Sequence, residues 1–417
     1  MANCQAESWE AFRATERRAT GLPAHPGSDR DVPAISAAGS TTYLDRLEQM
    51  PDHFAGRSVS AIGRRAFLKA GLAVPLAANV TSFETQEHLW RAFEIRVRVD
   101  VVAPQGSTRL WLPLLLSRLS PFQRTIAQEW SGNAQTIRVV DRAAQDVGIL
   151  EAIWVNHSAA PQLSLVMKVA TTGHQVPLET SDSTPPLAPA DRARYLAATA
   201  LIPTDGLVLE RATQITRAHR TPLARARAIY EWIVENTFRD PAVKGCGTGD
   251  IRWMLESGSL GGKCADLNAL FVGLCRAIGL PARDLYGIRV AESSRFKSLG
   301  RAGDITSAQH CRAEVFIERI GWVPVDPADV RKVILEERPG ATLDDRDVRR
   351  ARELLFGSWE MNWVAFNDGH DLRLPGSTGK PLPYFMYPQL EVNGVRRDSL
   401  DPAAFRYQIT VVQIPAP

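Results

Sequence analysis

One cysteine stands at a position where its thiol is expected to be reactive. Cys264 follows Gly261, Gly262 and Lys263 and precedes apolar residues at steps of three and four up to Ile278, the pattern of a helix with one buried face. The unpaired N–H groups and the positive dipole end at the start of such a helix stabilise a thiolate and lower the pKa of the thiol. The two glycines leave room for the backbone of a substrate. Cys264 is therefore the candidate nucleophile.

A thiol nucleophile needs an imidazole that accepts its proton and a third group that orients the imidazole. His310 opens a segment that alternates like a strand, and Asp326 closes the next such segment after a turn near residues 319–321. If this hairpin pairs Asp326 with His310 or with Arg312, the two side chains lie on one face of the sheet and can meet. A slip of one residue would separate them. The sequence leaves the register open.

The segments that must position these residues predict an α+β protein. Period-two strand patterns recur between residues 93 and 169, which favours an antiparallel β-sandwich. Helix patterns follow at residues 207–220 and 222–236, the second with Thr221 as N-cap and proline at its first position. Five parts are expected: a disordered leader with an export signal (1–80), a β-sandwich accessory domain (88–180), a linker (181–192), a catalytic core (193–345) and a C-terminal extension packed on the core (346–417).

Three motifs together resemble the bacterial transglutaminase-like superfamily. They are residues 262–266 (Gly-Lys-Cys-Ala-Asp), residues 280–283 (Leu-Pro-Ala-Arg), and His310 with residues 321–327 (Gly-Trp-Val-Pro-Val-Asp-Pro). The resemblance spans residues 226–332 and implies a papain-like core, in which N-terminal helices pack on an antiparallel sheet. It also implies that Cys264 is the nucleophile, His310 the base and acid, and Asp326 the residue that orients His310. Many members carry an aromatic residue where this sequence has Arg312.

Other residues have weaker claims on the site. Trp253, Gln309 and Arg312 are candidates to line the cleft or to stabilise an oxyanion, and core packing is the alternative for Trp253 and Gln309. Cys275 lies on the apolar helix face and is expected in the core. Three further residues are expected to be structural, free or in loops: Cys246, Cys311 and His370.

The region before the folded part resembles a twin-arginine export signal. Residues 63–69 read Gly-Arg-Arg-Ala-Phe-Leu-Lys and precede a mildly apolar stretch. The resemblance implies transit through the twin-arginine machinery and a periplasmic or other extracytoplasmic location. Signal peptides usually begin close to their arginines, so translation is expected to start at Met1 or, with a shorter leader, at Met50.

The composition excludes several classes of protein. The chain carries 49 Lys+Arg against 46 Asp+Glu, a net charge of +3 that gives no global case for nucleic-acid binding. The longest apolar run is too short for a membrane span. Five cysteines without metal-ligand spacing indicate neither a disulfide framework nor a metal site, and no cofactor is implied.

These observations predict a cysteine-dependent enzyme that transfers acyl groups from amide or peptide bonds through a thioester. Hydrolysis of a peptide or protein amide is favoured over transamidation. The alternatives are a non-catalytic peptide-binding or scaffolding module of the cell envelope, and a core that processes only the partner within an envelope complex.

Overall fold

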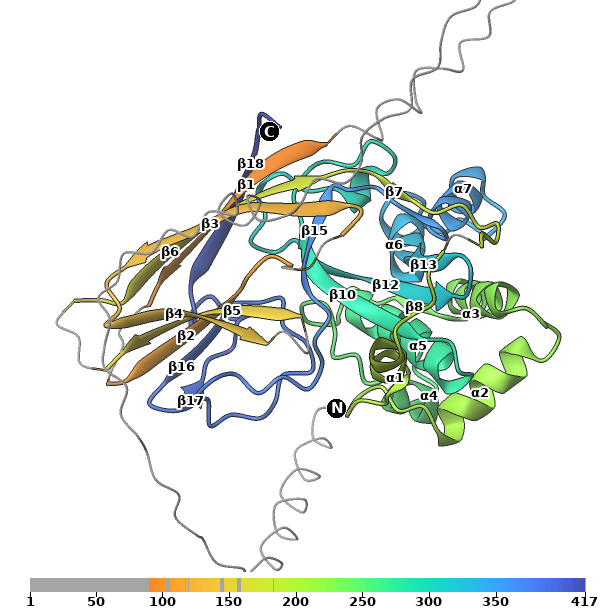
Figure 1. The fold of residues 1–417 in the computed structure, drawn as a ribbon, viewed down its shortest axis with the longest axis horizontal. Helices are drawn as coiled ribbons and strands as arrows, with labels where there is room; N and C mark the ends of the chain where they lie inside the picture. Colours follow the sequence, from red (N-terminus) through yellow and green to blue (C-terminus); the bar gives the residue numbers. More distant parts are fainter. Residues whose placement is uncertain are drawn as a thin grey trace, which may run out of the picture. The chain divides into compact units, whose positions relative to one another are not determined.

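The computed structural model describes residues 90–101, 106–116, 118, 120–142, 146–155, 159–182 and 184–416. The expected leader and export signal lie outside these residues. Within the described ranges, no helix is long and apolar enough to cross a bilayer. The described chain combines helices with antiparallel sheets, as the sequence predicts (Figure 1).

A four-stranded antiparallel sheet and one helix carry the candidate residues. The sheet has the order β13 (Gly321–Val325), β12 (Gln309–Ile317), β10 (Ala282–Arg289), β15 (Trp363–Asn367). Helix α5 (Cys264–Ala277) packs on β12 and β10. On these strands, Leu285 and Trp363 pack in a separate apolar cluster with Leu116 and Phe122. Every residue of β10 and β12 is buried, so the sheet gives the site a rigid support.

Local sequence signals determine the end of α5 and the start of α3 (Pro222–Asn236). After α5, Gly279 takes a left-handed φ of +81°, and Pro281 follows, which ends the helix as predicted. At the start of α3, Oγ1 of Thr221 accepts the N–H of Ala224 at 3.3 Å. The other described helices are α1 (Pro189–Leu196), α2 (Gly206–Thr216), α4 (Ile251–Ser257), α6 (Pro327–Glu336), α7 (Arg346–Leu354) and the 3-10 turn η4 (Lys297–Leu299).

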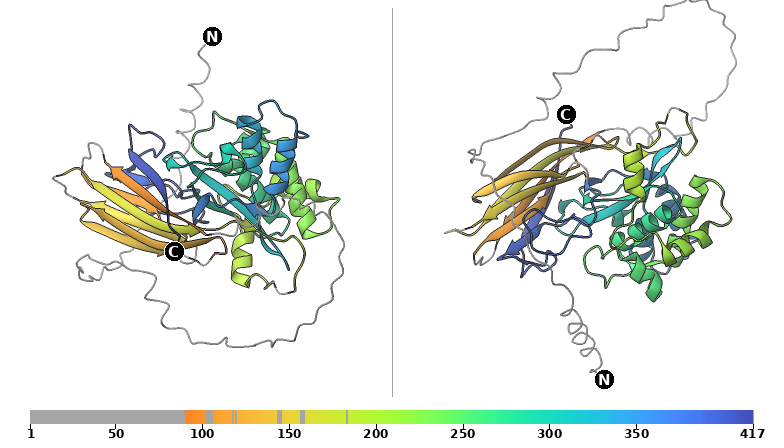
Figure 2. Two further views of the ribbon diagram at one scale, coloured as in Figure 1. Left: turned by 90° about the horizontal axis from the view of Figure 1, so that it is seen from above. Right: turned by 60° about the horizontal axis from the view of Figure 1, so that its bottom comes forward.

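Two five-stranded antiparallel sheets take up most of residues 91–171 and lie as two layers in Figures 1 and 2. In the first, Phe93, Ile95 and Val97 alternate with more exposed residues and join the same apolar cluster as Leu110 and Trp154 of the second. The first sheet has the order β11 (Gly303–Asp304), β18 (Tyr407–Ile414), β1 (Arg91–Asp100), β6 (Gln162–Thr171), β3 (Gln123–Gly132). The second has the order β17 (Val395–Arg396), β16 (Gln389–Val392), β2 (Thr108–Pro113), β5 (Val147–Trp154), β4 (Thr136–Arg142).

Strand β3 was not expected from the sequence. It lies at the edge of its sheet, and only Gln123, its first residue, is buried. An edge strand of this kind lacks the alternation of buried apolar residues that marks a strand in a sequence.

The chain after residue 346 differs from the expected extension packed on the core. Strand β15 completes the four-stranded sheet, whereas β16, β17 and β18 join the two five-stranded sheets. The reason is backbone pairing: β18 fills the side of β1 that β6 leaves open, with Ala92 paired to Ile414. Two short pairs complete the sheets: β7 (His174–Gln175) with β14 (Ser358–Trp359), and β8 (Phe238–Arg239), in parallel, with β9 (Gly261–Gly262).

Helix α1 also differs from the expectation, because it begins inside the predicted linker. Pro189 stands at its first position, where the fixed φ of proline suits a helix and the missing N–H costs nothing. The buried Tyr195 anchors the helix, and its ring lies edge-on to Trp322, with 5.0 Å between ring centroids. Three prolines between residues 185 and 189 favour a linker, but one of them, Pro189, starts a helix.

Candidate active site

Helix α5 begins at Cys264 because Asp266 holds the preceding chain in place. The carboxylate of Asp266 accepts hydrogen bonds from the backbone N–H groups of Thr248, Gly249 and Lys263, each at 2.9 Å. Asp266 is buried, so these bonds are shielded from water. They leave Cys264 as the first residue of the helix, 3% exposed. Its backbone N–H has no preceding helical turn to accept it and is free to bind an oxyanion.

Two glycines permit this arrangement. A Cβ atom on Gly247, whose φ is +94°, would lie 1.9 Å from Oδ2 of Asp266. A Cβ atom on Gly262 would lie 2.6 Å from the Cβ of Asp266. Both distances are far below van der Waals contact. The room at Gly262, expected for a substrate, is therefore occupied by the capping carboxylate.

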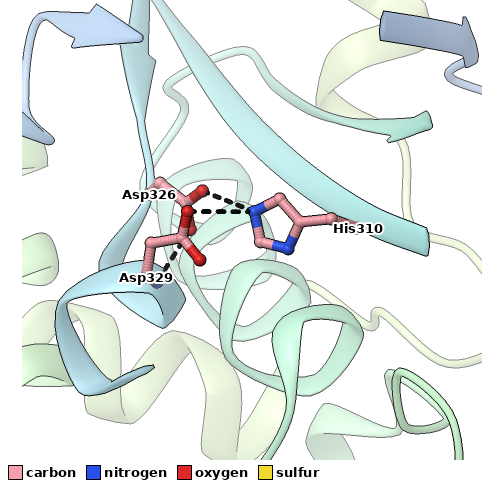
Figure 3. Close-up of side chains that lie close together, drawn as sticks. All are labelled: His310, Asp326 and Asp329. Atoms are coloured by element: carbon pink, nitrogen blue, oxygen red, sulfur yellow. Dashed lines mark hydrogen bonds and ion pairs between the residues drawn. The ribbon is translucent and has the colours of Figure 1, made fainter. Parts of the chain in front are cut away.

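His310 and Asp326 meet side chain to side chain (Figure 3). Nε2 of His310 lies 2.8 Å from Oδ2 of Asp326, and both residues are buried. The hairpin of β12 and β13 pairs Ala313 with Val325, which is one of the two registers compatible with this contact. The register left open by the sequence thus brings the two residues together.

Asp326 has a second structural role that fixes its orientation. Strand β13 ends at Val325, and Asp326 is the N-cap of α6, where its Oδ1 accepts the N–H of Asp329 at 3.1 Å. The side-chain Nδ2 of Asn268, on α5, lies 3.4 Å from the same oxygen. One carboxylate oxygen therefore caps a helix while the other faces His310.

A second carboxylate at His310 was missed in the sequence. Oδ2 of Asp329 lies 3.4 Å from Nε2 of His310 (Figure 3). Its Oδ1 accepts a hydrogen bond from Arg289 at 2.6 Å. The available signal was the spacing of Asp326 and Asp329, which are the N-cap and the third residue of α6. The partner Arg289 comes from β10, and no local pattern connects it with α6.

The charges around His310 favour the imidazolium form. Burial and the neighbouring Arg289 lower the pKa of His310, but the carboxylates of Asp329 and Asp326 outweigh them and raise it to about 10. Burial and Asp329 raise the pKa of Asp326, against the opposing effect of His310. The positive imidazolium therefore lies against two buried acids, both at its Nε2.

The thiol of Cys264 is shifted in the opposite direction. Its contacts with the thiols of Cys246 and Cys311, and then with His310, hold its pKa well below the ordinary range, although burial acts against them. Nε2 of His310 faces the carboxylates, so the other side of the ring is left for the thiol (Figure 3). A lowered thiol pKa beside a raised imidazole pKa is the pattern of a thiolate–imidazolium pair.

The other described cysteines have the opposite electrostatics, and all are unbridged thiols. Contact with Cys264 and burial raise the pKa of Cys246, whose Sγ donates to the carbonyl of Gln309 at 3.3 Å. Burial raises the pKa of Cys311 and of Cys275, the latter lying in the core as expected. Cys264 is the described cysteine whose surroundings favour a thiolate.

The structure separates the three weaker candidates. Gln309 lines the cavity beside Cys264, and its Nε2 is buried without a hydrogen-bond partner among the described residues. Arg312 is buried behind the site: its Nε lies 3.7 Å from Oδ2 of Asp326, and its guanidinium lies over Trp363, 5.0 Å from the ring centroid. Trp253 is 56% exposed on α4 and does not line the cavity.

Cys264 and His310 line a cavity of about 400 Å³. One of its walls comes from the end of the chain, where Tyr387, Phe405 and Arg406 contribute. This wall could not be anticipated from the motifs, because it lies far from them in the sequence.

His310, Asp326 and Asp329 form the one group among the described residues whose ligand atoms lie close enough together to hold a metal ion, within 4.8 Å of one another. These atoms are already engaged with one another and with Arg289. A protonated imidazole has no lone pair for a metal. The donor set therefore suits an ion-pair network better than a metal centre.

Comparisons with known proteins agree with this geometry. Residues 210–327 match the transglutaminase-like superfamily. An uncharacterised protein from Haemophilus influenzae is 35% identical over 348 residues, which cover 79% of this chain and 92% of the relative.

Solved structures resemble the chain at low sequence identity. A proposed cysteine protease from Cytophaga hutchinsonii has a TM-score of 0.49 and 13% identity, covering 79% of this chain and 92% of its own. The periplasmic domain of TgpA from Pseudomonas aeruginosa has a TM-score of 0.31 and 17% identity, covering 63% and 92%. The chain thus belongs to one family with the Haemophilus influenzae protein, and it carries a domain of the transglutaminase-like superfamily.

Proposed function

We propose that Cys264, His310 and Asp326 are the catalytic triad of an enzyme that transfers acyl groups from amide or peptide bonds. The observation that carries the proposal is the contact of 2.8 Å between His310 and Asp326 beside a thiol at a helix start. A protein that only bound peptides would need none of the three charges. Hydrolysis is the favoured outcome, because an acyl-enzyme in a cavity open to water meets water before a second amine.

The reaction runs through a thioester. The thiolate of Cys264 attacks the carbonyl carbon, and the developing oxyanion binds the N–H of Cys264 and a second donor, for which Gln309 is the candidate. His310 gives its proton to the leaving nitrogen as the C–N bond breaks. Water then attacks the thioester, His310 takes a proton from it, and the carboxylic acid leaves while the thiol is restored.

The domains that we propose are defined by the sheets and not by the order of the chain. We propose that the two five-stranded sheets form a β-sandwich domain and that the four-stranded sheet with α2 to α6 forms the catalytic core. Residues 389–414 then belong to the sandwich. Export through the twin-arginine route, an extracytoplasmic location and a peptide or protein substrate complete the proposal.

Alkylation of Cys264 by limiting iodoacetamide, read by peptide mass between about pH 5 and 9, tests the triad. A free thiol titrates near pH 8.5, so its alkylation rate would rise about tenfold per unit below that pH. The thiolate–imidazolium pair persists above the lowered pKa of Cys264 and below the pKa of His310, which is about 10. We therefore expect a nearly flat, fast rate at Cys264 over the neutral range.

The matched variant is His310→Ala. It removes the cation that holds the thiolate, so the rate at Cys264 should fall at neutral pH and recover only at alkaline pH. Cys275, buried in the core, serves as the slow internal control in both proteins. Uniformly slow labelling of native wild-type protein would leave the peptide-binding module as the better account.

A further inference from the structure

The cavity beside Cys264 has a charge of one sign. Apart from His310, its charged lining residues are all basic: Arg239, Lys263, Arg289, Arg301, Lys332 and Arg406. No Asp or Glu lines it within the described part of the chain, although the whole sequence is almost balanced at 49 basic and 46 acidic residues. The positive lining is therefore a property of this cavity and not of the protein as a whole.

Nearby carboxylates neutralise only part of this charge. Arg289 is paired with Asp329, and Arg239 and Lys332 share the single carboxylate of Glu336, at 3.5 and 2.6 Å.

The other cations are less engaged. Arg301 donates to the backbone carbonyl of Asp304 at 3.1 Å, and its charge helps to lower the pKa of the exposed Asp304 carboxyl. For Lys263 and Arg406, the described residues offer no carboxylate within ion-pair distance. The cavity therefore carries an excess of positive charge that the carboxylates of the described residues balance only in part.

The cations flank the reacting atom and extend to the surface. Lys263 directly precedes Cys264, and the pairing of β8 with β9 places Arg239 beside Gly262. Arg406 is exposed, whereas Cys264 is 3% exposed, so the lining runs from the surface to the thiol. Charges of one sign in a cleft with low-dielectric walls concentrate ligands of the opposite sign.

We infer that the acyl substrate is an anionic peptide, with a carboxylate close to the amide bond that is cleaved. This inference rests on the proposed function, because it assigns the cavity to the substrate of Cys264. The cleavage step itself does not require the excess charge: the thiolate needs one cation, which His310 supplies. The lining disfavours basic peptides and binds acidic ones, whose carboxylates pair with Lys263, Arg239 or Arg406.

Two alkylating reagents of nearly equal size test the inference without a known substrate. Iodoacetate carries a carboxylate, and iodoacetamide is neutral. The measured ratio is the rate of alkylation by iodoacetate divided by the rate of alkylation by iodoacetamide. At low salt we expect this ratio to be about ten times larger for Cys264 than for the neutral thiol 2-mercaptoethanol. The ratio should fall as the ionic strength rises.

Charge variants distinguish the effect of the basic lining residues on the ratio from the effect of the His310 imidazolium, which also attracts iodoacetate. Lys263→Gln and Arg406→Gln should each lower the ratio about twofold, and the double variant about fourfold. Arg252→Gln removes one charge from the exposed face of α4 and is the matched control, expected to leave the ratio unchanged. The neutral reagent reports in every variant whether Cys264 remains accessible and reactive.

Competitor peptides identify the source of the carboxylate. Two peptides are compared for their protection of Cys264 from alkylation. One is rich in glutamate and has an amidated C-terminus; the other has uncharged side chains and a free C-terminal carboxylate. Protection by either supports the inference and names the carboxylate.

Two results would overturn the inference while the triad stands: a ratio equal to that of the free thiol, or a raised ratio that both charge variants leave intact. Failure of iodoacetamide to label Cys264 would instead overturn the proposed function, and this inference with it.

Discussion

Replacing Asp326 by Ala is expected to slow acyl transfer by about 10⁴-fold, the effect of disturbing the residue that orients the imidazole in a catalytic triad. The variant removes the acceptor 2.8 Å from Nε2 of His310 and one of the two carboxylates that raise the pKa of His310. The release of nitrophenol from p-nitrophenyl acetate, which needs no specific substrate, measures the rate. We also expect the flat range of the alkylation rate at Cys264 to end at a lower pH, because the pKa of His310 falls when one carboxylate is lost.

Asp326→Asn separates catalysis from folding. Both oxygens of Asp326 accept hydrogen bonds, one from the N–H of Asp329 and one from His310. An amide has only one acceptor oxygen, so Asn satisfies either the helix cap or the imidazole. We expect a loss of activity similar to that for Ala, because an amide does not stabilise the imidazolium or fix its tautomer. The loss of stability should stay below the roughly 1 kcal/mol that Ala costs at an N-cap. Wild-type activity in Asp326→Ala would assign the orienting role to Asp329.

Replacing Asp266 by Ala is expected to destabilise the protein by about 4 kcal/mol. The substitution leaves three backbone N–H groups without their acceptor in a buried place, and each unsatisfied group costs roughly 1–3 kcal/mol, part of which water entry recovers. Denaturant unfolding measures the loss. In protein that remains folded, alkylation of Cys264 should be slower, because the turn that places Cys264 at the helix start loosens.

Two variants calibrate that result. Asp266→Asn keeps one acceptor oxygen for the N–H groups of Thr248 and Gly249 and loses the one for Lys263, so its cost should be intermediate. Asp345→Ala removes the N-cap of α7, a more exposed site, and should cost about 1 kcal/mol. A free energy of unfolding in Asp266→Ala equal to that of Asp345→Ala would contradict the buried-cap explanation.

The parts of the fold that the sequence predicted are those determined by neighbouring residues. Helix α5 and its end at Gly279, and helix α3 and its Thr221 cap, follow from periodicity and turn chemistry within about 15 residues. So do seven strands: β1, β2, β4, β5, β6, β12 and β13. Strand β3 was missed because an edge strand has little to bury. Helix α1 was missed because proline punctuates linkers and starts helices alike.

The candidate site divides in the same way. Cys264, His310 and Asp326 were predicted from motifs, and the structure places His310 and Asp326 2.8 Å apart. Their catalytic roles stay a prediction. The network around these residues was not predicted, because its members come from separate elements: Asp329 from α6, Arg289 from β10, and the cavity wall near Phe405. Trp253 is the opposite case: it was a candidate because it lies near the motif in the sequence, but it faces solvent on α4.

The pairing of β1 with β18 has a consequence for how the chain folds. Arg91 and Gln413, which are hydrogen-bonded to each other across this pair, are 322 positions apart, so β1 leaves the ribosome long before its neighbour exists. Contacts of this range slow folding, because a large loop must close before they form. The first sheet, and the cavity wall before β18, can assemble only late in synthesis. Unfinished chains that lack residues 387–407 would therefore carry Cys264 without one wall of its cavity.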